Sequence, residues 1–103
     1  MALEKRFLKS RPVCKVRFTI ASADLHGASQ ASVVGEFNGW DPKATPMKPQ
    51  KDGSLSAVLE IPSGREYRFR YYFTDKHRWM NEPHADGYEY CPFAATDNSL
   101  LNI

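Results

Sequence analysis

Residues 67–74 read Tyr-Arg-Phe-Arg-Tyr-Tyr-Phe-Thr, and this alternation sets the class of fold. Successive residues of a β-strand point to opposite faces of a sheet, so one face would hold Tyr67, Phe69, Tyr71 and Phe73. The other face would carry arginine, tyrosine and threonine. An apolar face opposite a polar one is typical of a strand that packs on a core with one side only. We therefore predict a strand here whose aromatic side chains build much of the core.

The same period of two recurs on both sides of this stretch. Further strands are expected at residues 13–20, 31–37, 55–61 and 98–103, with a short one at 78–81. Turn signals separate them, among them Asp52-Gly53 and the run Pro62-Ser63-Gly64. Residues 82–96 contain two prolines and a glycine, and we expect a long loop there. Short strands with frequent turns predict an all-β fold, an antiparallel sandwich rather than a parallel sheet.

The length of the chain argues against an independent enzyme. A chain of 103 residues builds one core and cannot form a barrel of eight strand-helix units, so an active site would be shallow and made of loops. A glycosidase needs two facing carboxylates, and nothing in the sequence selects a pair. The loop carboxylates are Asp41, Asp75, Glu82 and Asp86. Asp41 and Glu82 each precede a proline and are interpreted as turn residues. We expect no catalytic residues.

Positive charge is concentrated at the start of the chain. The formal net charge is +2, from 14 Lys and Arg against 12 Asp and Glu. The first 17 residues hold six of these cations and one of the anions, so the remainder is mildly acidic. We interpret residues 1–12 as a basic, solvated lead-in and residues 13–103 as the domain. A binder of phosphate backbones carries its basic stripe on the folded face, so this distribution argues against a nucleic-acid partner.

The cysteines predict a cytoplasmic domain with reduced thiols. The histidines and cysteines together predict no metal site, and we expect no other cofactor. Cys14 and Cys91 are far apart in the sequence, and reduced thiols are the expected state, although the sequence alone leaves a single disulfide open. The start of the chain lacks the apolar run of a signal peptide, and no stretch has the length and apolarity of a membrane span. His77, His84 and Cys91 fit no closed zinc pattern. We expect no membrane partner.

Two tryptophans stand among polar and turn-forming residues. Trp40 lies in the run Gly-Glu-Phe-Asn-Gly-Trp-Asp-Pro at residues 35–42, and Trp79 follows a second loop. An indole is a broad apolar plate with one N–H donor, which suits stacking on the C–H face of a sugar ring. Two loop tryptophans at one end of a sandwich would form a platform for a sugar chain. The alternative for Trp40 is a lid folded back over the end of the sandwich, and the residues leave both interpretations open.

Arg70 and Asn98 could donate hydrogen bonds to a sugar without requiring a charged ligand. Arg70 is expected on the outward face of its strand, and Asn98 opens the last strand. Each has an ordinary structural explanation as well, as a solvated strand cation and as a turn residue. The mixture of cations and aromatics around Arg70 also suggests single-stranded nucleic-acid binding. The period of two argues against it, because Phe69 and Tyr71 face away from the arginines and only Tyr72 shares their face.

These motifs together resemble one family. The resemblance is carried by VVGEFNGWDP (33–42), Pro46-Met47, Asp52-Gly53, YRFRYYFTD (67–75), WMNEP (79–83) and TDNSLLNI (96–103). They are similar to the family 48 carbohydrate-binding modules, which include the N-terminal domains of isoamylases and glycogen branching enzymes and the glycogen-binding domain of the AMP-activated protein kinase beta subunit. The resemblance implies an immunoglobulin-like β-sandwich of the early-set type. It further implies binding of α-1,4-glucans such as glycogen, starch or maltooligosaccharides.

The resemblance also implies the residues of the site. Trp40 and Trp79 match the two stacking tryptophans of the family. Asn98 matches an asparagine that hydrogen-bonds to sugar hydroxyls, and Thr96 lies in the matching loop. Arg70 stands where the binding domains of the family usually place lysine, and it presents a planar fork of donors instead of a point charge.

Two further implications concern the loop tip and the partner. The apolar residue of the family that enters a helical glucan lies near Ala94, which is small, and the neighbouring Phe93 could replace it. The module would be non-catalytic, either free-standing or attached to a glycoside hydrolase family 13 enzyme such as a branching or debranching enzyme. The alternative function is that of a docking module for a glucan-active enzyme or a kinase-type complex, with little affinity for sugar.

Overall fold

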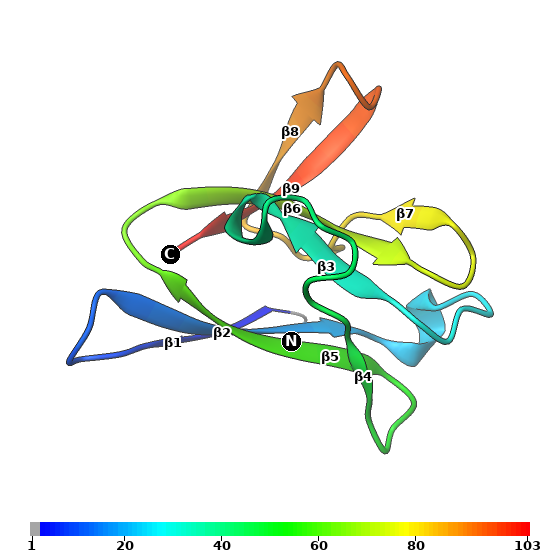
Figure 1. The fold of residues 1–103 in the computed structure, drawn as a ribbon, viewed down its shortest axis with the longest axis horizontal. Coiled ribbons are helices and arrows are strands. Elements are labelled where there is room, and N and C mark those ends of the chain that lie inside the picture. Colours follow the sequence, from blue (N-terminus) through cyan, green and yellow to red (C-terminus); the bar gives the residue numbers. More distant parts are fainter. Residues whose placement is uncertain (1–2) are drawn as a thin grey trace.

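Two antiparallel β-sheets face each other (Figure 1). Aromatic side chains fill much of the core between them. The computed structural model describes residues 3–103. Sheet A has the order β1-β2-β5-β4, with bounds Leu3–Phe7, Val13–Ile20, Leu55–Pro62 and Lys48–Pro49. Sheet B has the order β3-β6-β9-β8, with bounds Ser32–Gly35, Glu66–Phe73, Thr96–Asn102 and Gly87–Cys91, and β7 (Arg78–Met80) pairs with β6. The expected all-β, immunoglobulin-like sandwich is confirmed.

The core is built by the alternating faces that the sequence predicted. Tyr67, Phe69, Tyr71 and Phe73 of β6 point inward and are buried, while the residues between them are half-buried on the outer face. Phe18 of β2 meets Phe69 of β6 edge to face, with ring centroids 5.3 Å apart. Phe37, which follows β3, packs against Phe18 at 5.6 Å. Aromatic contacts of this kind stabilise a pair beyond its buried area, so the two sheets are joined mainly by rings.

The prediction of a continuous loop at residues 82–96 is wrong. Residues Gly87–Cys91 form β8, which pairs with β9 in the register Glu89↔Asn98. This hairpin projects from the body of the sandwich (Figure 1). Most of β8 is exposed, so its sequence lacks the contrast between apolar and polar positions that marks a strand buried on one face. The strand expected at 31–37 also ends early, at Gly35, because Glu36–Asn38 form the short 3-10 helix η2.

The segment expected to be a lead-in contributes a strand to sheet A. β1 pairs with β2 in antiparallel register, Leu3↔Phe18 to Phe7↔Cys14. Leu3 is buried, whereas the following side chains of β1 are exposed. The Lys5 ammonium lies 2.7 Å from the Asp86 carboxylate, across the sandwich. Residues 1 and 2 lie outside the described residues.

Cys14 and Cys91 are both free thiols, in agreement with the expected reduced state. Cys14 is buried in β2 of sheet A, and Cys91 ends β8 of sheet B. Burial raises the pKa of the Cys14 thiol above its ordinary value, because desolvation disfavours the thiolate. Cys14 is therefore an unreactive core residue.

Gly35 allows a close approach of β3 to β6 that a larger residue would prevent. A Cβ at this position would lie 2.7 Å from the carbonyl oxygen of Arg68 and 2.7 Å from the Cβ of Phe69. We expect Gly35→Ala to lower the free energy of unfolding by about 2 kcal/mol, because the sheet must shift to admit the methyl group. Urea unfolding measures the effect. Gly87→Ala is the matched control, since its Cβ meets the flexible end of Leu100 at 3.3 Å. Equal stability of the two variants would contradict the prediction.

Candidate functional site

The site is built on the outer face of sheet B, where the neighbour of β6 changes from β9 to β7. The ladder between β6 and β9 ends at Phe69↔Ser99, and the ladder between β6 and β7 begins at Tyr71↔Met80. Arg70 lies between these two points, on the outer face of β6. Its side chain therefore emerges at a junction of three strands, and β3 pairs on the other side through Val34↔Arg70.

The guanidinium of Arg70 lies against both tryptophans. Its central carbon is 4.9 Å from the ring centroid of Trp79 and 5.8 Å from that of Trp40. A cation within about 6 Å of an aromatic centroid is attracted by the negative charge on the ring face. We call Trp40, Arg70 and Trp79 the indole–guanidinium cluster. Two aromatic residues far apart in the sequence are thus joined by one central cation.

Trp40 is positioned by a tightly bonded loop. The Asn38 side chain accepts a hydrogen bond from the Gly35 backbone N–H at 3.0 Å and donates to the carbonyl of Val33 at 2.8 Å. The backbone N–H of Trp40 donates to the carbonyl of Gly35 at 2.9 Å. Trp40 has φ +60°, in the left-handed region that non-glycine residues rarely adopt. Such a conformation persists where the surroundings hold it, so the loop presents Trp40 in one orientation.

Trp79 lies on strand β7, which agrees with the short strand expected at 78–81 and corrects its description as a loop tryptophan. β7 places Trp79 directly opposite Tyr72 of β6, and the two ring centroids are 4.6 Å apart. The Tyr72 hydroxyl lies 3.0 Å from Nδ1 of His77. Trp79 keeps 45% of its surface exposed. Tyr72 and Arg70 both lie against the indole, while much of the residue remains open to solvent.

Asn98 and Thr96 lie on the same face of β9 as the cluster. One step beyond the last β6–β9 pair, the register brings Asn98 next to Arg70. Within the described residues, the buried Oδ1 of Asn98 and the buried Nε of Arg70 have no hydrogen-bond partner. Thr96 is exposed and begins β9, opposite Cys91. The structure therefore brings Trp40, Arg70, Trp79 and Asn98 together, with Thr96 farther out along the projecting hairpin.

Tyr72 is the neighbour of the cluster that the sequence did not assign to it. The period of two already placed Tyr72 on the outward face. Its contact with Trp79 depends on the pairing of β6 with β7, which no local pattern shows.

Arg68, the next outward residue of β6, shows how Arg70 differs from an ordinary surface cation. The Arg68 guanidinium donates to both carboxylate oxygens of Glu89, at 2.9 and 2.8 Å, and approaches Glu36 at 3.4 Å. The ion pairs of the described residues involve Lys5, Arg11 and Arg68. Arg70 is absent from them and instead contacts indole rings, so its terminal N–H groups are not committed to a carboxylate.

Glu82 precedes the turn at Pro83 and His84, as the sequence suggested, but its side chain is buried and has a structural role. Its side chain is fully buried; Oε1 accepts from the Tyr71 hydroxyl at 2.8 Å and Oε2 from the backbone N–H of His84 at 2.7 Å. Burial, together with the nearby Glu82 carboxylate, raises the pKa of Tyr71 well above its ordinary value. Ser99 donates to Asn81 through its hydroxyl and accepts from the Glu82 N–H. These bonds tie the chain after Trp79 to β9.

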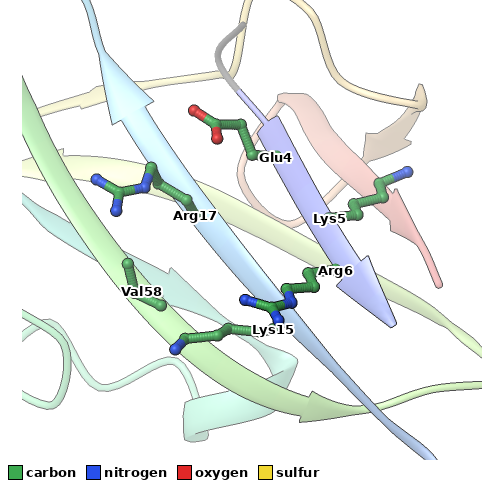
Figure 2. A pocket seen from close by; sticks show the side chains of 6 residues that line it. All are labelled: Glu4, Lys5, Arg6, Lys15, Arg17 and Val58. Atoms are coloured by element: carbon green, nitrogen blue, oxygen red, sulfur yellow. The ribbon is translucent and has the colours of Figure 1, made fainter. Parts of the chain in front are cut away.

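A hollow of about 430 Å³ lies on the outer face of sheet A, away from the cluster (Figure 2). It is lined by Glu4, Lys5, Arg6, Lys15, Arg17 and Val58. Its lining is mostly cationic, and a neutral sugar gains little from such charge. The indole–guanidinium cluster instead offers apolar plates. Among residues 3–103, no group of three or more His, Cys, Asp or Glu side chains is arranged to hold a metal ion.

The fold and the cluster together define a β-sandwich module with an exposed aromatic surface on one sheet. A family model described as carbohydrate-binding module 48 (isoamylase N-terminal domain) matches residues 17–85. The chain belongs to this family of carbohydrate-binding modules.

Similar proteins include two 1,4-alpha-glucan branching enzymes named GlgB. The protein of Photobacterium profundum is 35% identical over 60 residues, and that of Burkholderia pseudomallei (strain 668) is 36% identical over 69 residues. These alignments cover 57% and 65% of this chain but only 8% and 9% of the enzymes. Within residues 3–103, no helix has the length and apolarity needed to cross a membrane.

Proposed function

We propose that this chain binds α-1,4-glucans without catalysis, by stacking sugar rings on Trp40 and Trp79. The observation that carries the proposal is the indole–guanidinium cluster, in which Arg70 lies within 6 Å of both rings. Glucan chains alternate apolar ring faces with hydroxyl edges. A pair of fixed, partly exposed indoles with a donor-rich cation between them supplies the complement to both.

Asn98 and Arg70 would bind the hydroxyl edges. A sugar hydroxyl both donates and accepts, and these residues offer a carbonyl oxygen and several N–H groups. The Oδ1 of Asn98 and the Nε of Arg70 are covered by neighbouring atoms and have no partner among the described residues. Unpaired buried polar atoms carry a free-energy cost that a new partner removes. We expect a small movement of these two side chains to bring them to the ligand, with Thr96 contributing from β9.

The family and the similar enzymes support a glucan as the ligand. Both named relatives are 1,4-alpha-glucan branching enzymes, and the matching segment is a small part of each. The proposed role is that of an accessory module for glucan metabolism, acting alone or joined to such an enzyme. Its surface site is shallow, and a flexible oligosaccharide must be ordered on binding, so weak affinity is expected.

A glucan titration followed by NMR tests the proposal. We expect maltoheptaose at millimolar concentration to shift the signals of Trp40, Trp79, Arg70 and Asn98 and to quench tryptophan fluorescence. Cello-oligosaccharide of similar length is the control, because its flat β-linked chain presents the rings with a different curvature. Unchanged signals at these four residues would contradict glucan binding. Binding to single-stranded DNA at physiological salt, without a response to glucan, would favour nucleic acid instead.

A further inference from the structure

Strand β8 is an open edge of sheet B. The sheet order β3-β6-β9-β8 leaves one side of β8 without a neighbouring strand among residues 3–103. Its backbone N–H and C=O groups on that side are available to another strand. Tyr90 is 61% exposed and Tyr88 46% exposed, so apolar surface accompanies the free backbone groups. The hairpin also projects from the body, which removes steric obstacles to a partner (Figure 1).

The edges at β1, β4 and β3 carry the protective features that natural sheets use against pairing. β1 presents the consecutive charges Glu4, Lys5 and Arg6. β4 is two residues long and ends in Pro49. The edge of β3 is covered by residues 45–47, through hydrogen bonds from Val33 N–H to the Thr45 carbonyl and from Met47 N–H to the Ala31 carbonyl. β8 contains neither lysine nor proline, and Glu89 is its one charged residue.

We propose that β8 pairs antiparallel with β8 of a second copy of this chain. The five residues of β8 are Gly87, Tyr88, Glu89, Tyr90 and Cys91. A two-fold axis through Glu89 is the arrangement that pairs all five, and it keeps the inner and outer faces of both sheets aligned. In this register Tyr88 of each copy lies opposite Tyr90 of the other copy, which gives two such pairs. Aromatic cross-strand pairs are among those that stabilise antiparallel sheets.

The charge at the centre of this interface is already neutralised. The two-fold axis places Glu89 opposite Glu89 of the second copy, and like charges directly opposite each other are unfavourable. Each Glu89, however, accepts two parallel hydrogen bonds from Arg68 of its own chain, at 2.9 and 2.8 Å. Fork-shaped pairs of this kind are strong and well oriented. The charge of Glu89 therefore does not oppose pairing with a second copy.

The pairing would place two indole–guanidinium clusters on one continuous face. The two-fold axis is perpendicular to sheet B, so the outer faces of both copies look in the same direction. If the proposed glucan binding holds, one long glucan could engage both sites, and the second binding event would be intramolecular. This consequence rests on the proposed function, whereas the pairing itself does not.

A designed disulfide tests the register of the pair. In the proposed dimer, position 87 lies opposite Cys91 of the second copy. Within one chain the two positions are four residues apart on a strand, about 13 Å, which is too far for a disulfide. We expect Gly87→Cys to form a covalent dimer under mild oxidation, while the wild type does not, because its two Cys91 residues are equally distant in this register. Ala23→Cys, an exposed cysteine away from β8, is the control for random collision.

A charged side chain introduced on β8 tests the same interface without relying on a disulfide. Sedimentation without glucan should show the wild type moving from one protomer toward two at high micromolar concentration, since an interface of this size is weak. Tyr90→Lys should remain monomeric and should suppress cross-linking of Gly87→Cys. Phe7→Lys, an exposed aromatic on β1, should change neither result. A monomeric wild type, or cross-linking of Gly87→Cys no faster than that of Ala23→Cys, would overturn the proposal whatever the outcome of the glucan titration.

Discussion

Replacing Trp40 by alanine is expected to lower the affinity for maltoheptaose at least tenfold, which corresponds to about 1.4 kcal/mol or more. The variant loses one stacking plate and one of the two rings that hold Arg70, whose guanidinium lies 5.8 Å from the Trp40 centroid. The fold should remain intact, because Trp40 is only half-buried and the Asn38 bonds that shape the loop do not involve its indole. Isothermal titration and urea unfolding measure the two quantities separately.

Controls distinguish loss of stacking from loss of structure. Alanine is no better suited than tryptophan to φ +60°, so Trp40→Ala leaves the backbone strain in place. Trp40→Phe keeps an aromatic plate and should retain part of the affinity. Phe7→Ala removes an exposed ring from sheet A and should leave glucan binding unchanged. An affinity of Trp40→Ala equal to that of the wild type would refute stacking at this position.

Replacing Glu82 by alanine is expected to lower the free energy of unfolding by about 3 kcal/mol. The change leaves the Tyr71 hydroxyl and the His84 N–H without their acceptor in a fully buried position, and it opens a cavity. A domain of this size has a total stability of only about 5–15 kcal/mol, so the loss is a large share. Urea unfolding measures this loss of free energy, with the same m-value for the wild type and the variant.

Two variants calibrate this effect. Glu66→Ala removes an exposed carboxylate of β6 and should cost less than about 0.5 kcal/mol. Glu82→Gln keeps an amide oxygen for the Tyr71 hydroxyl but not a second acceptor for the His84 N–H, so we expect an intermediate loss. It also provides a measurable variant if Glu82→Ala does not fold. A loss below about 1 kcal/mol in Glu82→Ala would contradict the structural role of this carboxylate.

Most of the strands that the sequence predicted correctly have a buried face, whereas the short strand β7 was also predicted and is largely exposed. Residues 13–20 and 67–73 largely alternate between apolar and polar side chains, and the observed strands β2 and β6 match them closely. β8 was missed because an exposed edge strand imposes no such alternation. β1 was missed for the same reason, since Leu3 is the one buried residue in it. Apolar and polar residues alternate along a strand when one face of it is buried. A strand without a buried face therefore shows little of this alternation in its sequence.

For the candidate site, the sequence predicted the residues and the tertiary structure shows how they are arranged. Indole and amide side chains next to turn signals, together with the family resemblance, were enough to select Trp40, Trp79 and Asn98. The contact of Arg70 with both tryptophans arises from the pairing of β6 with β3, β7 and β9, which joins segments that are distant in the sequence; Trp40 and Trp79 are 39 positions apart.

The alternation along the chain was sufficient to establish the all-β class, because side chains in a strand must point alternately to two faces. It also established which faces would form the core. Long-range pairing between strands decided three other features: the partner of each strand, the open edge at β8 and the buried acceptor at Glu82. Their energies depend on atoms that are distant in sequence, so no local pattern encodes them.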